Sequence, residues 1–149
     1  MQNSDSKSRA LFRFITAVPT RWGDADALGH VNNVLYVRYL ETGRLDYLHR
    51  ILKLNFEHPI EQTILIADMQ LSYLKQIAHP TNLEVTSRIS RLGNTSFDVE
   101  ANIYIEGDEK PVVTSKAVAV WFNLAENRKE IIPQSIRELV SNYEVVKPC

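Results

Sequence analysis

The chain contains a single cysteine among its 149 residues, and this cysteine, Cys149, is the last residue. An intrachain disulfide is therefore excluded, and a catalytic thiol is not expected at the end of a chain. The formal net charge of −1 lacks the basic excess typical of proteins that bind nucleic acids. No segment is apolar enough to span a membrane, and Arg9 and Arg13 interrupt the region where a signal peptide would need its apolar core. These absences predict a cytoplasmic protein that binds neither nucleic acids nor membranes.

The sequence also lacks the short motifs of several large enzyme classes. It has no G-x-S-x-G motif of serine hydrolases, no G-x-G-x-x-G dinucleotide motif and no P-loop. The four histidines are not spaced as metal ligands are; they are His30, His49, His58 and His79. The sequence therefore predicts a protein that works without a metal ion or an organic cofactor.

What the sequence does contain is one long helical pattern among several strand patterns. Apolar residues recur at helical spacing over residues 34–54, which predicts a helix about 30 Å long. The predicted apolar stripe of this helix consists of Val37, Leu40, Leu45, Leu48 and Leu52. Alternating or apolar segments predict strands at residues 10–18, 62–74, 82–92, 97–105 and 112–122, and a short helix at residues 133–142.

The connections between these strands indicate how they pair. Gly93-Asn94 and Gly107-Asp108 are typical of tight turns, which join antiparallel strands. We therefore predict an α+β fold, a single domain over residues 1–149, in which a curved antiparallel sheet of about five strands wraps around the long helix. Residues 1–8 are predicted to be a flexible tail. Residues 117–121 are apolar on both faces, which predicts a second covered surface, most simply a dimer interface.

Polar residues are concentrated in the loop that precedes the long helix. Asp24, Asp26 and His30 lie in this loop, and Asn32 or Asn33 is placed to cap the helix. A carboxylate here can act on water or on a carbonyl carbon, while free N–H groups of the first helical turn can polarise that carbonyl. Acyl transfer from a thioester needs both features. Aspartate and asparagine are also common as turn and capping residues, so both interpretations stay open on spacing alone.

Four charged residues outside the loop have two interpretations each. Lys75, Arg88 and Arg91 either bind a phosphate group or are solvated residues at strand ends. Asp68 is an isolated carboxylate in an apolar strand, either a second acid or an exposed edge residue.

The loop and the helix together resemble a known family. The segment WGDADALGHVNNVLYVRYLETGR, residues 22–44, is similar to the N-terminal motif of hotdog-fold acyl-CoA thioesterases of the 4-hydroxybenzoyl-CoA thioesterase type. The resemblance continues through LSYLKQIAHPTNLEV, SRLGNTSFDVEANIY and TSKAVAVWFN, so it covers nearly the whole chain. Plant acyl-carrier-protein thioesterases have a similar run, in which the histidine matches His30 and an asparagine stands in place of Leu28.

This resemblance implies an acyl-CoA thioesterase with a hotdog fold and no cofactor. It implies that Asp26 is the base or nucleophile and that backbone N–H near Asn33 polarises the thioester carbonyl, with His30 as a further catalytic candidate. The substrate-binding residues that it suggests are Asn32, Lys75, Arg91 and Ser96. It also implies a homodimer with a continuous sheet and two interface sites spanned by CoA, often doubled to a tetramer.

Two other functions are compatible with the same fold. One is a binding protein that holds an acyl thioester without cleaving it, and the other is a hydratase or dehydratase. Relatives with hydratase chemistry place a histidine and a carboxylate around the helix in a different motif. The spacing in residues 22–33 therefore favours hydrolysis.

Overall fold

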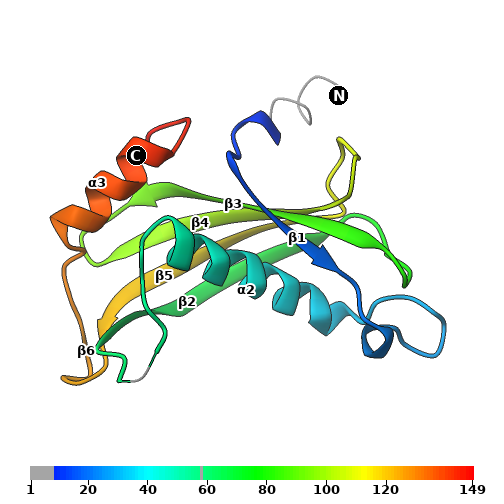
Figure 1. Cartoon of the computed structure of the whole chain (residues 1–149), viewed down its shortest axis with the longest axis horizontal. Coiled ribbons are helices and arrows are strands. Elements are labelled where there is room, and N and C mark those ends of the chain that lie inside the picture. The colour runs from blue at the N-terminus through cyan, green and yellow to red at the C-terminus, as the bar shows by residue number, and fades with distance from the viewer. Residues whose placement is uncertain (1–8, 58) are drawn as a thin grey trace.

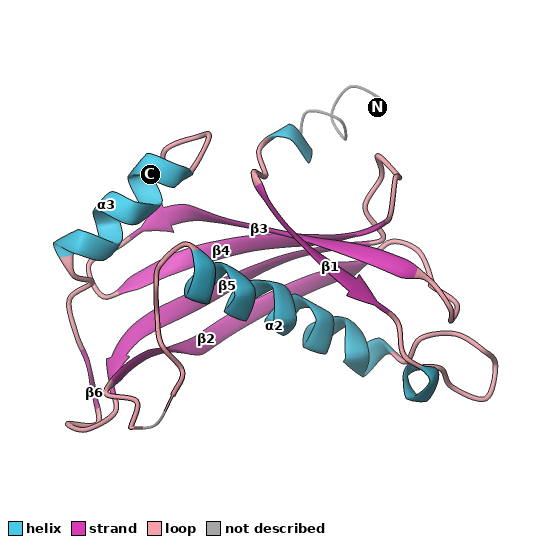
Figure 2. Cartoon of the chain, in the orientation of Figure 1, coloured by secondary structure: helices cyan, strands magenta, loops and turns pink. Residues whose placement is uncertain are grey.

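The computed structural model describes residues 9–57 and 59–149, so the predicted tail at residues 1–8 and His58 lie outside the described residues. One long helix lies across a curved antiparallel sheet (Figures 1 and 2). The helices are α2 (Asn33–Arg50), α3 (Gln134–Tyr143) and the 3-10 turn η1 (Trp22–Asp24). The strands are β1 (Phe14–Pro19), β2 (Gln62–Tyr73), β3 (Asn82–Leu92), β4 (Ser96–Ile105), β5 (Val113–Asn123) and β6 (Arg128–Lys129).

The six strands form one sheet in the order β1-β3-β4-β5-β2, with the two-residue β6 beside β5. All the pairings are antiparallel. This arrangement confirms the predicted α+β hotdog fold, in which a curved sheet wraps around one long helix. Strand β5 lies between β4 and β2, as its doubly apolar sequence predicted. No helix of the described residues is long and apolar enough to cross a membrane.

The buried stripe of α2 differs from the predicted one. Val37 and Leu45 are 38% and 41% exposed. The buried residues follow the spacing i, i+3, i+4, i+7 but are mostly not aliphatic; they are Tyr36, Tyr39, Leu40, Gly43, Arg44, Tyr47 and Leu48. Leu40, Leu48 and Leu52 are buried as predicted. The prediction missed the tyrosines because each is buried with a hydrogen-bond partner for its hydroxyl group, which composition does not reveal.

Gly43 sets how closely α2 approaches β3. A Cβ atom at this position would lie 2.5 Å from Cγ1 of Val85. We expect Gly43→Val to lower the free energy of unfolding by about 3 kcal/mol, because the helix would have to move off the sheet. Urea unfolding measures this change, with Thr42→Val on the exposed side of the same helix as the control. Equal stability of the two variants would contradict the close approach.

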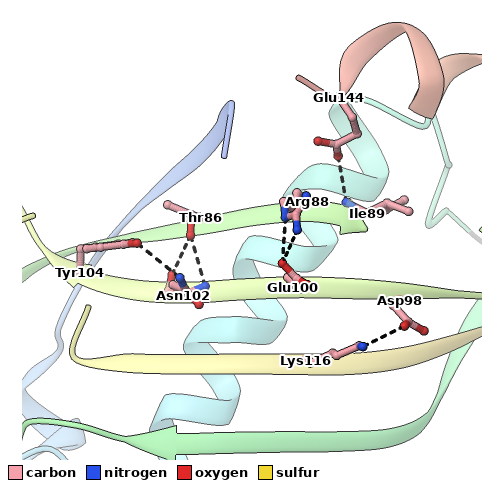
Figure 3. A network of polar contacts seen from close by, with 9 residues as sticks. All are labelled: Thr86, Arg88, Ile89, Asp98, Glu100, Asn102, Tyr104, Lys116 and Glu144. Atoms are coloured by element: carbon pink, nitrogen blue, oxygen red, sulfur yellow. Dashed lines mark hydrogen bonds and ion pairs between the residues drawn. The ribbon is translucent and has the colours of Figure 1, made fainter. Parts of the chain in front are cut away.

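The two faces of the sheet differ in chemistry. The face toward α2 carries the apolar core, including Phe97, Ile103 and Trp121. The opposite face carries a network of polar contacts (Figure 3). In this network Arg88 pairs with Glu100 at 2.7 Å, Lys116 with Asp98 at 3.3 Å, and the hydroxyl of Thr86 contacts the backbone of Asn102. The outer face is therefore largely neutralised within the protomer.

Glu144, which follows α3, joins the C-terminal segment to the core. Its Oε1 atom accepts hydrogen bonds from the Tyr47 hydroxyl and from the N–H of Ile89. Burial raises the pKa of the Glu144 carboxyl above its ordinary value of 4.5, and these hydrogen bonds offset the rise only in part. The native state therefore holds this proton more tightly than the unfolded chain does.

This raised pKa predicts a pH-dependent effect of Glu144→Gln. The free energy of unfolding of the wild type should fall relative to that of the variant as the pH rises above 4.5, because the native carboxyl loses its proton at a cost that glutamine does not have. Urea unfolding between about pH 4 and pH 8 measures the difference. The exposed Glu138→Gln on α3 is the control, and a difference for Glu144→Gln that did not vary with pH would contradict the assignment.

Candidate active site

The loop between β1 and α2 is fixed to one end of the sheet by its backbone. The N–H of Thr20 donates to the carbonyl of Thr81 at 2.9 Å, and the N–H of Val31 donates to the carbonyl of Ile77 at 2.8 Å. A β-bridge between His30 and Ala78 adds a third attachment. The polar residues of the loop are therefore held against the first turn of α2 by a defined backbone (Figure 1).

Asp24 is the buried aspartate of the loop. Its Oδ2 atom accepts from the Tyr39 hydroxyl at 2.6 Å and from the N–H of Arg21 at 2.9 Å, and the Arg21 guanidinium lies 3.4 Å from Oδ1. Burial raises the pKa of the Asp24 carboxyl, but these hydrogen bonds and the Arg21 charge outweigh burial and leave the pKa below its ordinary value. Asp24 is thus an ionised anchor that joins the loop to α2, with its carboxylate already occupied.

Asp26 is the exposed aspartate, and the loop holds only one of its two oxygens. Oδ1 accepts from the N–H groups of Leu28 at 2.9 Å and His30 at 3.2 Å. Gly29, at φ +80°, closes the turn by donating its N–H to the Asp26 carbonyl at 3.0 Å. Within residues 9–57 and 59–149, Oδ2 makes no hydrogen bond. The carboxylate is therefore fixed in orientation while one oxygen faces outward.

The first turn of α2 keeps a backbone N–H donor that is not used by any described residue. Asn32 caps the helix, its Oδ1 accepting from the N–H of Val34 at 3.1 Å, and its carbonyl accepts from the N–H of Leu35 at 2.9 Å. The N–H of Asn33 has no acceptor in the part of the chain that the structure describes. It points out of the helix N-terminus, where the positive end of the helix dipole lies. This donor matches the backbone N–H predicted near Asn33.

Among the described residues, His30 and Asn33 form hydrogen bonds through backbone atoms and not through their side chains. His30 contacts Asp26 through its backbone, and its ring makes no hydrogen bond to the described residues. The Asn33 side chain is exposed, and the backbone carbonyl of Asn33 accepts from the Tyr73 hydroxyl at 3.4 Å. The loop thus brings Asp26, His30, Asn32 and Asn33 together.

The other predicted residues fall into two groups. Lys75 follows β2 at the same end of the sheet as the loop and lines a groove of about 580 Å³. Arg91 and Ser96 lie at the opposite end, where β3 turns into β4, and Arg91 donates to Ser96 at 3.3 Å and to Asp98 at 2.8 Å. One protomer therefore does not place Arg91 and Ser96 beside Asp26.

Residues 20–140 match the model of the thioesterase-like superfamily. The chain belongs to this superfamily. The match spans the loop, α2, strands β2 to β6 and most of α3, so it includes every part of the candidate site described above.

The chain is similar to solved structures and to curated proteins. The PA5185 protein of Pseudomonas aeruginosa is 29% identical with a TM-score of 0.84, covering 91% of this chain and 94% of that protein. A thioesterase from Thermus thermophilus, complexed with coenzyme A and Zn, is 28% identical with a TM-score of 0.75, covering 89% of this chain and 94% of the other. The ATL3 acyl-acyl carrier protein thioesterase of Arabidopsis thaliana is 26% identical over 116 residues, which are 76% of this chain. The chain spans about three fifths of the length of the curated relatives that it matches.

Two residues near the loop between β1 and α2 were not predicted from the sequence. Tyr73 ends β2 with its ring edge-on to Tyr36 and its hydroxyl on the first turn of α2. Lys110 lines the same groove as Lys75. No local sequence pattern marks Tyr73 or Lys110 as a site residue, because they come near the site only when β2 and β5 pair. Among the described residues, no group of three or more His, Cys, Asp or Glu side chains is placed to hold a metal ion.

Proposed function

We propose that this thioesterase-superfamily protein hydrolyses an acyl-CoA thioester to a free acid and CoA, in the manner of the 4-hydroxybenzoyl-CoA thioesterases that residues 22–44 resemble. The observation that carries the proposal is the geometry of Asp26, whose one oxygen is held by two backbone N–H groups while the other is unoccupied. The unused N–H of Asn33 lies at the adjoining helix end. The coenzyme A bound to the Thermus relative supports a CoA substrate.

The Asp26 carboxylate and the N–H of Asn33 can hydrolyse a thioester by either of two routes. As a base, Asp26 removes a proton from water while the water oxygen attacks the thioester carbon. As a nucleophile, it attacks that carbon itself and forms an anhydride, which water then cleaves. In both routes the carbonyl oxygen becomes an oxyanion that the N–H of Asn33 stabilises, and the CoA thiolate leaves and takes up a proton. His30 holds Asp26 through its backbone N–H, and Asn32 fixes the helix end.

The distribution of the remaining residues supports a dimer with shared sites. Strand β2 is the edge of the sheet, twelve residues long and mostly exposed. If two β2 strands pair antiparallel about a two-fold axis, opposite ends of the two sheets come to the same side. Arg91 and Ser96 of the partner subunit would then approach Asp26, with Lys75 available to the CoA phosphates. A dimer of dimers is the further assembly that we propose.

The direct test is release of free thiol from a panel of acyl-CoA thioesters, followed with a thiol-reactive dye. The proposal expects turnover with at least one aliphatic or aromatic acyl group. Tight binding of acyl-CoA without any thiol release would overturn hydrolysis and support a non-catalytic binding protein. Hydration of an enoyl-CoA without thiol release would support the hydratase alternative.

A further inference from the structure

Arg44 is a buried cation in the middle of α2. It is 8% exposed and lies between the fully buried Leu40 and Leu48 on the same side of the helix. The preceding residue, Gly43, faces Val85 of β3. Asp46, which accepts from Thr16 of β1, lies on the flank of α2 toward β1, and at about 100° per residue Arg44 lies on the opposite flank, toward β5 and β2. Figure 1 shows β2 as the sheet edge on that side.

The guanidinium of Arg44 has no close partner in residues 9–57 and 59–149. Among the described residues it forms no hydrogen bond and no ion pair. Glu41, one turn earlier, attracts it from beyond ion-pair distance, and burial lowers the pKa of Arg44. Two other arginines with largely buried side chains each contact a carboxylate: Arg9 contacts Glu84 at 3.0 Å, and Arg88 contacts Glu100 at 2.7 Å. The Arg44 nitrogens are not among the fully buried side-chain nitrogens without a partner in the described residues, so the guanidinium reaches the surface and is open to an acceptor from outside the protomer.

Three exposed apolar residues lie on the same side of the protomer as Arg44 and the candidate site. Val37 lies two turns before Arg44 and therefore on the same flank of α2. On β2, Ile66 and Tyr73 pair with the buried Ala119 and Val113, which places them on the helix side of the sheet. All three apolar residues are exposed, and Tyr73, at 51%, contacts Asn33 at the proposed oxyanion site. An acyl chain whose carbonyl binds there can extend along these three residues.

We propose that Arg44 determines acyl specificity by binding a carboxylate at the far end of the acyl chain. The inference rests on the proposed function and names its substrate class, the monothioesters of dicarboxylic acids. Asn33 and Arg44 are about 16 Å apart along the helix axis, and arginine side chains lean back toward the N-terminus. A substrate carboxylate that reaches Arg44 therefore lies about 10–15 Å from the thioester carbon. At about 1.2 Å per bond, an extended acyl chain spans this distance with about 8–12 bonds. A guanidinium and a carboxylate form a bidentate pair, which apolar side chains cannot replace.

The test compares decanoyl-CoA with the CoA monothioester of decanedioic acid. The wild type is expected to have the higher kcat/KM for the carboxylated substrate. Arg44→Met should lower kcat/KM for that substrate by roughly 10- to 100-fold and leave decanoyl-CoA turnover unchanged or faster. Arg38→Met, at an exposed arginine of the same helix, is the control. Arg44→Lys keeps the charge but loses the bidentate geometry of the guanidinium. Its kcat/KM for the carboxylated substrate should lie between those of the wild type and Arg44→Met.

Other outcomes overturn the inference in distinguishable ways. Equal preference of the wild type for the two substrates would refute the role of Arg44 while leaving thioester hydrolysis intact. A loss of both activities in Arg44→Met, together with dissociation to monomers in light scattering, would show that a carboxylate of the second subunit is the partner. If neither Arg44→Met nor Arg44→Lys folds, calorimetry can compare the binding of the two substrates to Asp26→Asn, which keeps Arg44. Equal affinity for the two substrates would refute the inference. Absence of turnover with every thioester would refute the proposed function itself.

Discussion

Asp26→Asn is expected to lower kcat for acyl-CoA hydrolysis by roughly 10²- to 10⁴-fold, because an amide is neither a base nor a nucleophile toward a thioester. The fold should survive, since the amide oxygen can still accept from the N–H groups of Leu28 and His30. KM should change little if the carboxylate acts only in the chemical step. Thiol release under saturating substrate measures kcat directly.

Asp24→Asn is the matched control, because it changes the other aspartate of the same loop. Asp24 accepts from Tyr39 and Arg21 in a buried position, so this change is expected to lower the thermal unfolding temperature. Asp26→Asn should leave the unfolding temperature near that of the wild type. Unchanged turnover in Asp26→Asn, or a loss of turnover only in Asp24→Asn, would reverse the roles assigned to the two aspartates.

The second large effect concerns assembly. The protein is expected to be at least a dimer at micromolar concentration in light scattering, because Asp26 lies at one end of the sheet and Arg91 and Ser96 at the other. A site made from one protomer would lack the latter two residues. A monomer that retains full activity would contradict the shared site.

Mixing two impaired variants tests the shared site directly. Asp26→Asn damages one half of each site, and Arg91→Ala damages the half that the partner would supply. After mixing in equal amounts, activity below KM should recover to about one quarter of the wild type, since about half of the dimers are mixed and each has one intact site. Arg128→Ala, at an exposed arginine of β6, is the control partner and should itself be nearly fully active. No recovery would place Arg91 outside the site of the neighbouring subunit.

The sequence by itself determined most of the secondary structure and the composition of the loop. Two bounds were wrong: β1 begins at Phe14 where the strand was predicted from residue 10, and α2 ends at Arg50 where the helix was predicted to reach residue 54. Strand β3 was predicted to the residue, and β2 and β5 to within one residue, because apolar alternation and turn residues act over a few neighbouring positions. The cluster of Asp26, His30, Asn32 and Asn33 is local in the chain, so the motif alone indicated it. Short elements without such a pattern, η1 and β6, were not predicted.

Only the tertiary structure decided which face of α2 is buried and what each polar residue contacts. Tyr39 can be buried because Asp24 accepts a hydrogen bond from its hydroxyl group, and Gly43 is needed because Val85 of β3 lies against it. The same contact distinguishes the two aspartates, since it occupies Asp24 and leaves Asp26 exposed. These contacts join residues from different elements, and their energies depend on distances that no local pattern contains. The same reason applies to Arg44, whose role in acyl specificity is inferred from its lack of a hydrogen-bond or ion-pair partner among the described residues.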